Sequence, residues 1–209
     1  MIVLCHRGWW LARHEQNGEA AFRRALAAGF GIETDLRDRD RGVVIAHDPP
    51  GPDAIPVERL LDLAVEALDG GPLALNVKAD GLQGPLQDAL RDRPTLDWFL
   101  FDMSIPDMLG SRRRGMPYFT RESEVEPEPA LYGDAAGVWM DQFFDDWIDA
   151  DWISRHLDAG KRVAIVSPEL HGRDHRGFWD RLSRVPAARD ARVMLCTDFP
   201  DRARDLFDA

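Results

Sequence analysis

Two carboxylates two residues apart mark the segment GIETDLRDRDRGVVIAHD, residues 31–48. Side chains alternate along a strand, so Glu33 and Asp35 would share one face while Ile32 and Leu36 take the other. Two like charges this close repel each other unless a positive group lies between them, and a hard divalent cation with oxygen ligands would meet this need. Most strands with such a pair simply have a solvated outer face, so the pair alone does not define a site.

The segment LALNVK shows the same spacing. Asn76 and Lys78 would share the inward face of a strand, with Val77 packing outward. The amide oxygen of Asn76 could complete the ligands of a cation, and Lys78 offers positive charge to an anion such as phosphate. A lysine at a strand end is usually only solvated, so its significance depends on the residues around it.

Two histidines follow predicted strands, His6 after the first and His47 after the second. Each by itself is more often a hydrogen-bonded structural group. Beside a cation and a lysine, however, two imidazoles could act as general base and general acid, because they titrate near neutral pH. Cleavage of a phosphodiester needs both roles, and Arg7 could neutralise the charge that grows on the phosphate oxygens.

Short apolar runs alternate with amphipathic stretches along the chain, which is typical of a parallel sheet covered by helices. Strands are expected at Ile2–Cys5, Phe30–Leu36, Val43–Ala46, Leu73–Val77, Trp98–Phe101, Tyr118–Thr120, Gly137–Met140, Arg162–Val166 and Arg192–Cys196. Helices are expected at Glu19–Ala28, Val57–Leu68, Gly84–Arg91, Ile105–Arg113, Ala150–Ala159, His175–Arg184 and Pro200–Phe207. If the second and third runs form one strand region interrupted by a polar turn, eight strand positions remain, the number of a (β/α)8 TIM barrel. An open, doubly wound sheet has a similar rhythm.

Polar side chains collect where the predicted strands end. They are His6, Arg7, Asn76, Lys78, Asp102, Ser104, Asp141, Ser167, Glu169, Thr197 and Asp198. The carboxyl ends of barrel strands form the rim on which active sites are built, so this distribution favours a common site there.

The composition fits a folded chain of 209 residues, for which we expect a single domain spanning residues 1–209. The net charge of −11 argues against nucleic acid or an anionic membrane as a partner. No stretch approaches the roughly 18 apolar residues of a membrane span, and the expected location is cytoplasmic. Cys5 and Cys196 lie in apolar runs and are expected to be buried, reduced thiols.

Five short motifs give the sequence a resemblance to a known family. HRG after the first strand, QN and AF before and in the next helix, ETD in the second strand and HD after the hairpin resemble the glycerophosphodiester phosphodiesterase family, within the phospholipase-C-like phosphodiesterase superfamily. The match is strong over residues 1–48 and thinner beyond, where NVK stands in place of Glu-x-Lys and TDFP resembles a closing Thr-Asp-x-Pro. The resemblance implies a TIM barrel with His6 and His47 as the acid and base, Glu33 and Asp35 as metal ligands, and Arg7 and Lys78 as phosphate contacts.

The sequence departs from the family pattern at three places. Asn76 replaces an acidic ligand, which removes a negative charge from the metal site, although the nearby Asp80 could compensate. The short stretch between His47 and Asn76 implies that the family insertion after the second strand region is absent. The segment VAIVSPEL lacks the Trp-Thr-x-Asn pattern found late in the family.

Aromatic and histidine residues later in the chain have competing interpretations. Trp139 ends the sixth strand and could wall the substrate pocket, or it could pack in the core. His171 and His175 in HGRDHRG resemble a metal-binding tract, but a polar loop before a helix fits better.

The preferred prediction is a phosphodiesterase that depends on Mg²⁺ or Ca²⁺ and cleaves a small glycerophosphodiester-like substrate. The same site could instead release a cyclic phosphate, if a substrate hydroxyl attacks in place of water. Asn76 also leaves open a non-catalytic barrel that binds a phosphorylated metabolite. An amidohydrolase-type barrel fits less well, because no His-x-His pair ends the first strand.

Overall fold

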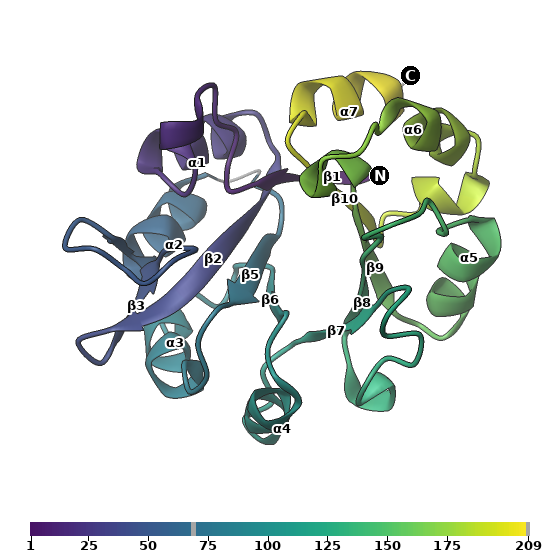
Figure 1. Ribbon diagram of the computed structural model, residues 1–209. Helices are drawn as coiled ribbons and strands as arrows, with labels where there is room; N and C mark the ends of the chain where they lie inside the picture. The colour runs from purple at the N-terminus through teal and green to yellow at the C-terminus, as the bar shows by residue number, and fades with distance from the viewer. Residues whose placement is uncertain (68–69, 208–209) are drawn as a thin grey trace. The chain divides into compact units, whose positions relative to one another are not determined.

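The computed structural model describes residues 1–67 and 70–207 (Figure 1). Its internal contacts divide the chain into two compact units. The first unit is Leu4–Tyr118, and the second unit comprises Met1–Val3 and Phe119–Ala209. In both units parallel strands alternate with helices, as the sequence predicts.

The first unit is built on four parallel strands in the order β1-β2-β5-β6. They are β1 (Ile2–His6), of which Leu4–His6 lies in this unit, β2 (Gly31–Arg39), β5 (Leu73–Val77) and β6 (Trp98–Phe101). The pairing register places His6 opposite Glu33 on one side of β2 and Asn76 opposite Asp35 on the other. Because in-register neighbours in a sheet share a face, polar residues from three distant segments converge around β2.

The first unit contains four helices, of which the first three lie between its parallel strands and the fourth follows β6. They are α1 (Glu19–Ala27), α2 (Val57–Glu66), α3 (Gln83–Leu90) and α4 (Ile105–Arg113). Figure 1 shows α1, α2 and α3 on the outer side of β2 and β5. The apolar spacing of α2 explains its burial, since Leu60, Leu61 and Ala64 fall on one face and are buried. Ser104 begins α4 by accepting a hydrogen bond from the backbone N–H of Asp107.

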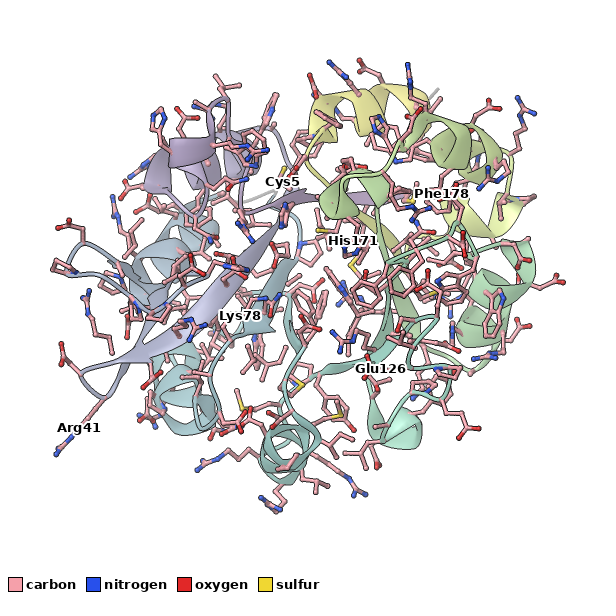
Figure 2. The ribbon with its side chains drawn as sticks, viewed as in Figure 1. Cys5, Arg41, Lys78, Glu126, His171 and Phe178 are labelled. Carbon is pink, nitrogen blue, oxygen red and sulfur yellow. The ribbon has the colours of Figure 1, made fainter. Side chains whose placement is uncertain are left out.

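The second and third predicted runs form an antiparallel hairpin of β2 and β3 (Gly42–Ile45). Asp40 and Arg41 form its tight turn with φ values of 51° and 67°, the backbone combination of a type I′ turn. Arg41 is labelled at the tip of this hairpin in Figure 2. The hairpin therefore occupies one parallel position, as the sequence predicts, while the two-residue strand β4 (Ile55–Pro56) was not expected.

The second unit contains the parallel strands β7 to β10 in chain order. The strands are β7 (Phe119–Glu122), β8 (Gly137–Met140), β9 (Arg162–Val166) and β10 (Val193–Thr197), and the helices are α5 (Ala150–Asp158), α6 (Arg176–Ser183) and α7 (Pro200–Phe207). Short 3₁₀ turns, which the sequence did not predict, lie at η1 (Arg13–Glu15), η2 (Tyr132–Asp134), η3 (Pro168–His171) and η4 (Pro186–Arg189).

Most element boundaries agree with the sequence to within one or two residues, and β5, β6, β8, β9, α4 and α7 agree at both ends. The structure ends α2 at Glu66, whereas the predicted helix extended to Leu68, which lies outside the described residues. Cys5 and Cys196 are fully buried reduced thiols, which confirms the prediction for both. None of the described helices is both long enough and apolar enough to cross a membrane.

The start of β2 is packed so closely that it has no room for a side chain. A Cβ atom at Gly31 would lie 2.5 Å from Leu4 Cδ2 and 2.7 Å from the carbonyl oxygen of Pro72. We therefore expect Gly31→Ala to lower the free energy of unfolding by about 1–3 kcal/mol, as overpacking does in dense cores.

Urea denaturation of the natural protein and of Gly31→Ala measures this change in the free energy of unfolding. Gly51→Ala is the matched control, because a Cβ there meets no atom within 4 Å, and it should change stability by less than about 0.5 kcal/mol. Equal stability of the two variants would contradict the packing described for Gly31.

Candidate active site

The two carboxylates of β2 lie on the same face and are buried. Glu33 is 2% exposed and Asp35 is 1% exposed, which excludes the alternative of a solvated outer face. Ile32 and Leu36 on the opposite face are fully buried as well. Two carboxylates without water around them need positive charge or hydrogen-bond donors nearby, so their surroundings define the site.

Two cationic side chains contact Asp35. The Nε atom of Arg7 lies 3.2 Å from Asp35 Oδ2, and the Nζ atom of Lys78 lies 3.5 Å from Asp35 Oδ1. Lys78 also lies 3.9 Å from Asp102 Oδ2. Lys78 directly follows β5 and is labelled beside the broad arrow of β2 in Figure 2. The predicted phosphate contacts and the predicted metal ligands thus form one network of charges.

The HRG motif turns the chain sharply at the end of β1. The backbone N–H of Arg7 donates to the carbonyl oxygen of Glu33 at 2.9 Å, and it lies 3.2 Å from Glu33 Oε2. Arg7 and Gly8 both have positive φ, 58° and 82°. A Cβ at Gly8 would lie 2.9 Å from Ala21 Cβ on α1, so glycine satisfies both the backbone conformation and the close approach of the helix.

The two predicted acid–base histidines lie in different environments. His6 Nε2 lies 3.9 Å from Glu33 Oε2, and its side chain is 20% exposed. The side chain of His47 is 46% exposed, with Nδ1 3.0 Å from Asp48 Oδ1. The neighbouring Ala46 donates its N–H to the carbonyl oxygen of Asp35 at 3.0 Å, which holds the backbone before His47 against β2.

The surroundings of Glu33 disfavour the ionised form of its carboxylate. Burial raises the pKa of Glu33 to about 7, and the charge of Asp35 adds to this rise. His6, Arg7 and Lys78 oppose the rise. A cation beside these oxygens would therefore relieve an unfavourable charge that the protein itself only partly balances.

Asn76 supplies a third oxygen at the same place. Its Oδ1 atom is buried and has no hydrogen-bond partner among the described residues. A buried amide oxygen without a donor costs free energy unless a ligand satisfies it, and oxygen donors are what Mg²⁺ and Ca²⁺ prefer. No cluster of three or more His, Cys, Asp or Glu suited to a metal occurs in the described parts of the chain, and the third oxygen here comes from an amide. Glu33, Asp35 and Asn76 together fit a hard divalent cation.

Asn17 belongs to this network although the sequence analysis gave it no role. Its Nδ2 donates to Asp35 Oδ2 at 2.8 Å, and its Oδ1 accepts from the hydroxyl of Thr34 at 2.8 Å. It is the asparagine of the QN motif, and an asparagine in a loop before a helix is a signal for a left-handed turn, which its φ of 56° confirms.

Asp80 does not take the place that the sequence suggested for it. It is exposed and accepts a hydrogen bond from the Ser104 hydroxyl at 3.0 Å. The acidic side chain that contacts Lys78 besides Asp35 is Asp102, which follows β6 and has a φ of 67°. Between His47 and Asn76 the described residues form only β4, α2 and β5, with no inserted domain.

A cavity of about 520 Å³ adjoins these residues within the first unit. Arg7, Asn17 and His47 line it, together with Arg13 from η1 and Asp53 from the loop before β4. Its apolar wall comes from residues 45–46 and 54–55. A cavity of this size accommodates a small organic molecule, and the residues that line it include one of the two predicted acid–base histidines.

The remaining predicted rim residues, Asp141, Ser167, Glu169, Thr197 and Asp198, lie in the second unit. Asp141 Oδ1 lies 2.6 Å from His171 Nε2, and Glu169 accepts hydrogen bonds from the hydroxyls of Ser167 and Thr197. Trp139 on β8 is 4% exposed. Its proposed contact with substrate remains a prediction.

The chain has an α/β fold that matches TIM-barrel proteins, as the sequence predicts. The sequence matches no protein-family profile, and no curated protein resembles it in sequence. Comparison of the fold with solved structures nevertheless finds likeness over essentially the whole chain.

Three of these structures are phosphodiesterases or a phospholipase. A phosphodiesterase from Oleispira antarctica, solved with its product sn-glycerol-3-phosphate, is 15% identical with a TM-score of 0.70, covering 100% of this chain and 97% of that one. A glycerophosphodiester phosphodiesterase from Agrobacterium tumefaciens is 17% identical with a TM-score of 0.66, and both chains are covered in full. A Ca²⁺-dependent phosphatidylinositol-specific phospholipase C from Streptomyces antibioticus is 13% identical with a TM-score of 0.55, covering 99% of this chain and 95% of that one.

The raised pKa of Glu33 predicts how the stability of the metal-free protein depends on pH. Because the native pKa, about 7, exceeds the usual value of 4.5, the folded state binds more protons than the unfolded state between these values. The free energy of unfolding should therefore fall as the pH rises through this range. Glu33→Gln removes this titration. When the pH rises from about 5 to about 8, the free energy of unfolding of the variant should therefore increase by about 1–3 kcal/mol relative to that of the natural protein.

Urea denaturation in the presence of a chelator at both pH values tests the prediction. Glu66→Gln is the control, because Glu66 is exposed on α2. If the free energy of unfolding depends on pH in the same way for Glu33→Gln and Glu66→Gln, the buried carboxylate of Glu33 does not cause the pH dependence of stability.

Proposed function

We propose that this protein is a phosphodiesterase that hydrolyses a small glycerophosphodiester-like substrate with the help of a divalent cation. The observation that carries the proposal is the ion-pair network around Asp35, which brings Arg7 and Lys78 from two different strand ends to one buried acidic pair. Such a cluster can hold a tetrahedral anion between cationic side chains and a metal. The fold likeness to glycerophosphodiester phosphodiesterases supports the same class of reaction.

Arg7 and Lys78 would bind and orient the phosphate. Both side chains are partly exposed, at 23% each, so an incoming anion can reach them. Asp35, on β2, holds both cationic groups, which reduces the freedom they would lose on binding. As negative charge grows on the phosphate oxygens in the transition state, these two groups would stabilise it.

His6 and His47 would move the two protons of the reaction. A water molecule forms a bond to phosphorus and gives its proton to one imidazole, which acts as the base. The bond from phosphorus to the leaving oxygen breaks, and the other imidazole delivers a proton to that oxygen. The products are an alcohol and a phosphate monoester, and atoms and charge balance without a further reactant.

Glu33, Asp35 and Asn76 would hold the cation. When bound, Mg²⁺ or Ca²⁺ supplies positive charge that polarises a phosphate oxygen. The amide of Asn76 brings an oxygen without a charge, so this site carries one negative charge fewer than a site with three carboxylates. Its affinity for a divalent cation should be correspondingly lower.

The cavity beside Arg7 and His47 would receive one alcohol of the diester. Its walls combine apolar side chains with Arg13 and Asp53, and neither Trp, Tyr nor Phe is among the described residues that line it. Quaternary ammonium groups are usually recognised by aromatic cages, so these walls favour a polyol or a primary amine over choline.

Removal of either histidine should abolish turnover while leaving the protein folded. We expect His6→Ala and His47→Ala each to lower kcat by about 10²–10⁴-fold, because each loses one proton transfer. Hydrolysis of glycerophosphoethanolamine, glycerophosphoglycerol, glycerophosphocholine and a chromogenic diester is measured, with phosphorus NMR to separate a monoester from a cyclic phosphate.

His14→Ala is the control for this series, because His14 is exposed on η1. Unchanged rates of hydrolysis in both His6→Ala and His47→Ala would contradict the acid–base mechanism. Absence of turnover by the natural protein on every diester, with ligand binding retained, would favour the non-catalytic alternative.

The cation should be required and weakly held. A chelator is expected to abolish hydrolysis, and added Mg²⁺ or Ca²⁺ should restore it. Asn76→Asp keeps the shape of the side chain and adds a carboxylate, so it should lower the Kd of the cation by about tenfold. Calorimetric titration of the two proteins measures the difference. A cation affinity that Asn76→Asp leaves unchanged would show that position 76 is not a ligand.

A further inference from the structure

We propose that Asn17 is a positioning residue that fixes the orientation of the Asp35 carboxylate for cation binding, and that Thr34 fixes Asn17 in turn. The inference rests on the cation site of the proposed function. It concerns a side chain that reaches Asp35 from the loop before α1 rather than from the sheet.

The hydrogen bonds of Asn17 determine which way its amide points. An ionised carboxylate can only accept hydrogen bonds, so the group that faces Asp35 Oδ2 at 2.8 Å must be the NH₂ of Asn17. The amide oxygen then faces Thr34 Oγ1 at 2.8 Å, and the threonine hydroxyl must donate to it. A chain of two donors therefore runs from Thr34 through Asn17 to Asp35.

The backbone at Asn17 favours asparagine over other polar residues. Its φ of 56° lies in the left-handed region, where asparagine, aspartate and glycine are tolerated best. Glycine has no side chain to donate, and aspartate would place a second acceptor against Asp35. The backbone N–H of Asn17 also donates to the carbonyl oxygen of Arg7 at 2.9 Å. Asn17 therefore connects the turn at Arg7 to Asp35 on β2.

The result is an asymmetric Asp35 carboxylate. Oδ2 accepts from Asn17 at 2.8 Å and faces the Arg7 guanidinium at 3.2 Å. Oδ1 has the longer contact, 3.5 Å to the ammonium group of Lys78. The Asn17 hydrogen bond and the Arg7 ion pair on Oδ2 hold the carboxylate plane, as partners behind metal ligands do in known metal sites.

The experiment measures cation affinity without turnover. Mn²⁺ serves as the probe, and its Kd is obtained by electron paramagnetic resonance titration of the natural protein and its variants. Asn17→Gly keeps the left-handed backbone and deletes the amide, while Thr34→Val keeps the side-chain shape and deletes the hydroxyl. We expect Asn17→Gly to raise the Kd by about tenfold or more and Thr34→Val to raise it by a smaller factor.

The double variant tests the chain of donors. If Thr34 acts through Asn17, the variant Asn17→Gly with Thr34→Val should bind Mn²⁺ no more weakly than Asn17→Gly alone. Asp40→Gly is the matched control, because Asp40 also has a left-handed backbone, with φ 51°, but lies at the tip of the β2–β3 hairpin. It should leave the Kd unchanged, and urea denaturation of all variants confirms that they are folded.

The outcomes separate this inference from the proposed function. A natural protein that binds no Mn²⁺ overturns the cation site, and this inference with it. A natural protein that binds Mn²⁺ with the same Kd as Asn17→Gly overturns the role of Asn17 alone. Additive effects of the two substitutions on the Kd overturn the role of Thr34. If Asp40→Gly raises the Kd as much as Asn17→Gly does, the effect comes from the change of backbone and the role of the Asn17 amide is overturned.

Discussion

The burial of two carboxylates on one face of β2 is the constraint from which the rest of the site follows. Glu33 and Asp35 are almost completely removed from water, and their mutual repulsion raises the cost. Arg7 and Lys78 offset part of that cost, and Asn17 contributes a neutral donor. A protein keeps such an arrangement against its own stability when the charges serve binding or catalysis.

Parallel pairing lets a short strand collect residues from distant parts of the chain. His6 and Asn76 are 70 positions apart in the sequence, yet each lies in register with an acid of β2. The HRG turn adds Arg7 through its backbone contact with Glu33, and the strand exit of β5 adds Lys78. Every group in the proposed reaction except His47 therefore lies on β2 or within one residue of a β2 pairing partner, and His47 follows the residue that hydrogen-bonds to Asp35.

The fold and the site support the function in different ways. Likeness to solved phosphodiesterases at 13–17% identity establishes the α/β architecture, which many unrelated activities share. The chemistry instead depends on the residues of this chain, above all on the orphaned oxygen of Asn76 beside two buried carboxylates. Asn76 also distinguishes this site from the pattern of the family that the sequence resembles. An amide in place of an acid changes the charge that the site presents to a cation.

Sequence by itself determined the alternation of strands and helices, the shared face of Glu33 and Asp35, and the grouping of His6, Arg7, Asn76 and Lys78 at strand ends, because these follow from local periodicity and from short motifs. It did not determine the network around Asp35. Asn17 was visible only as part of a motif, Asp80 was named as an acid that could compensate for Asn76 although it is exposed, and Asp102 had no assigned partner. Hydrogen bonds between residues far apart in the chain depend on loop conformation and on strand register to within one residue, and only the tertiary structure fixes both.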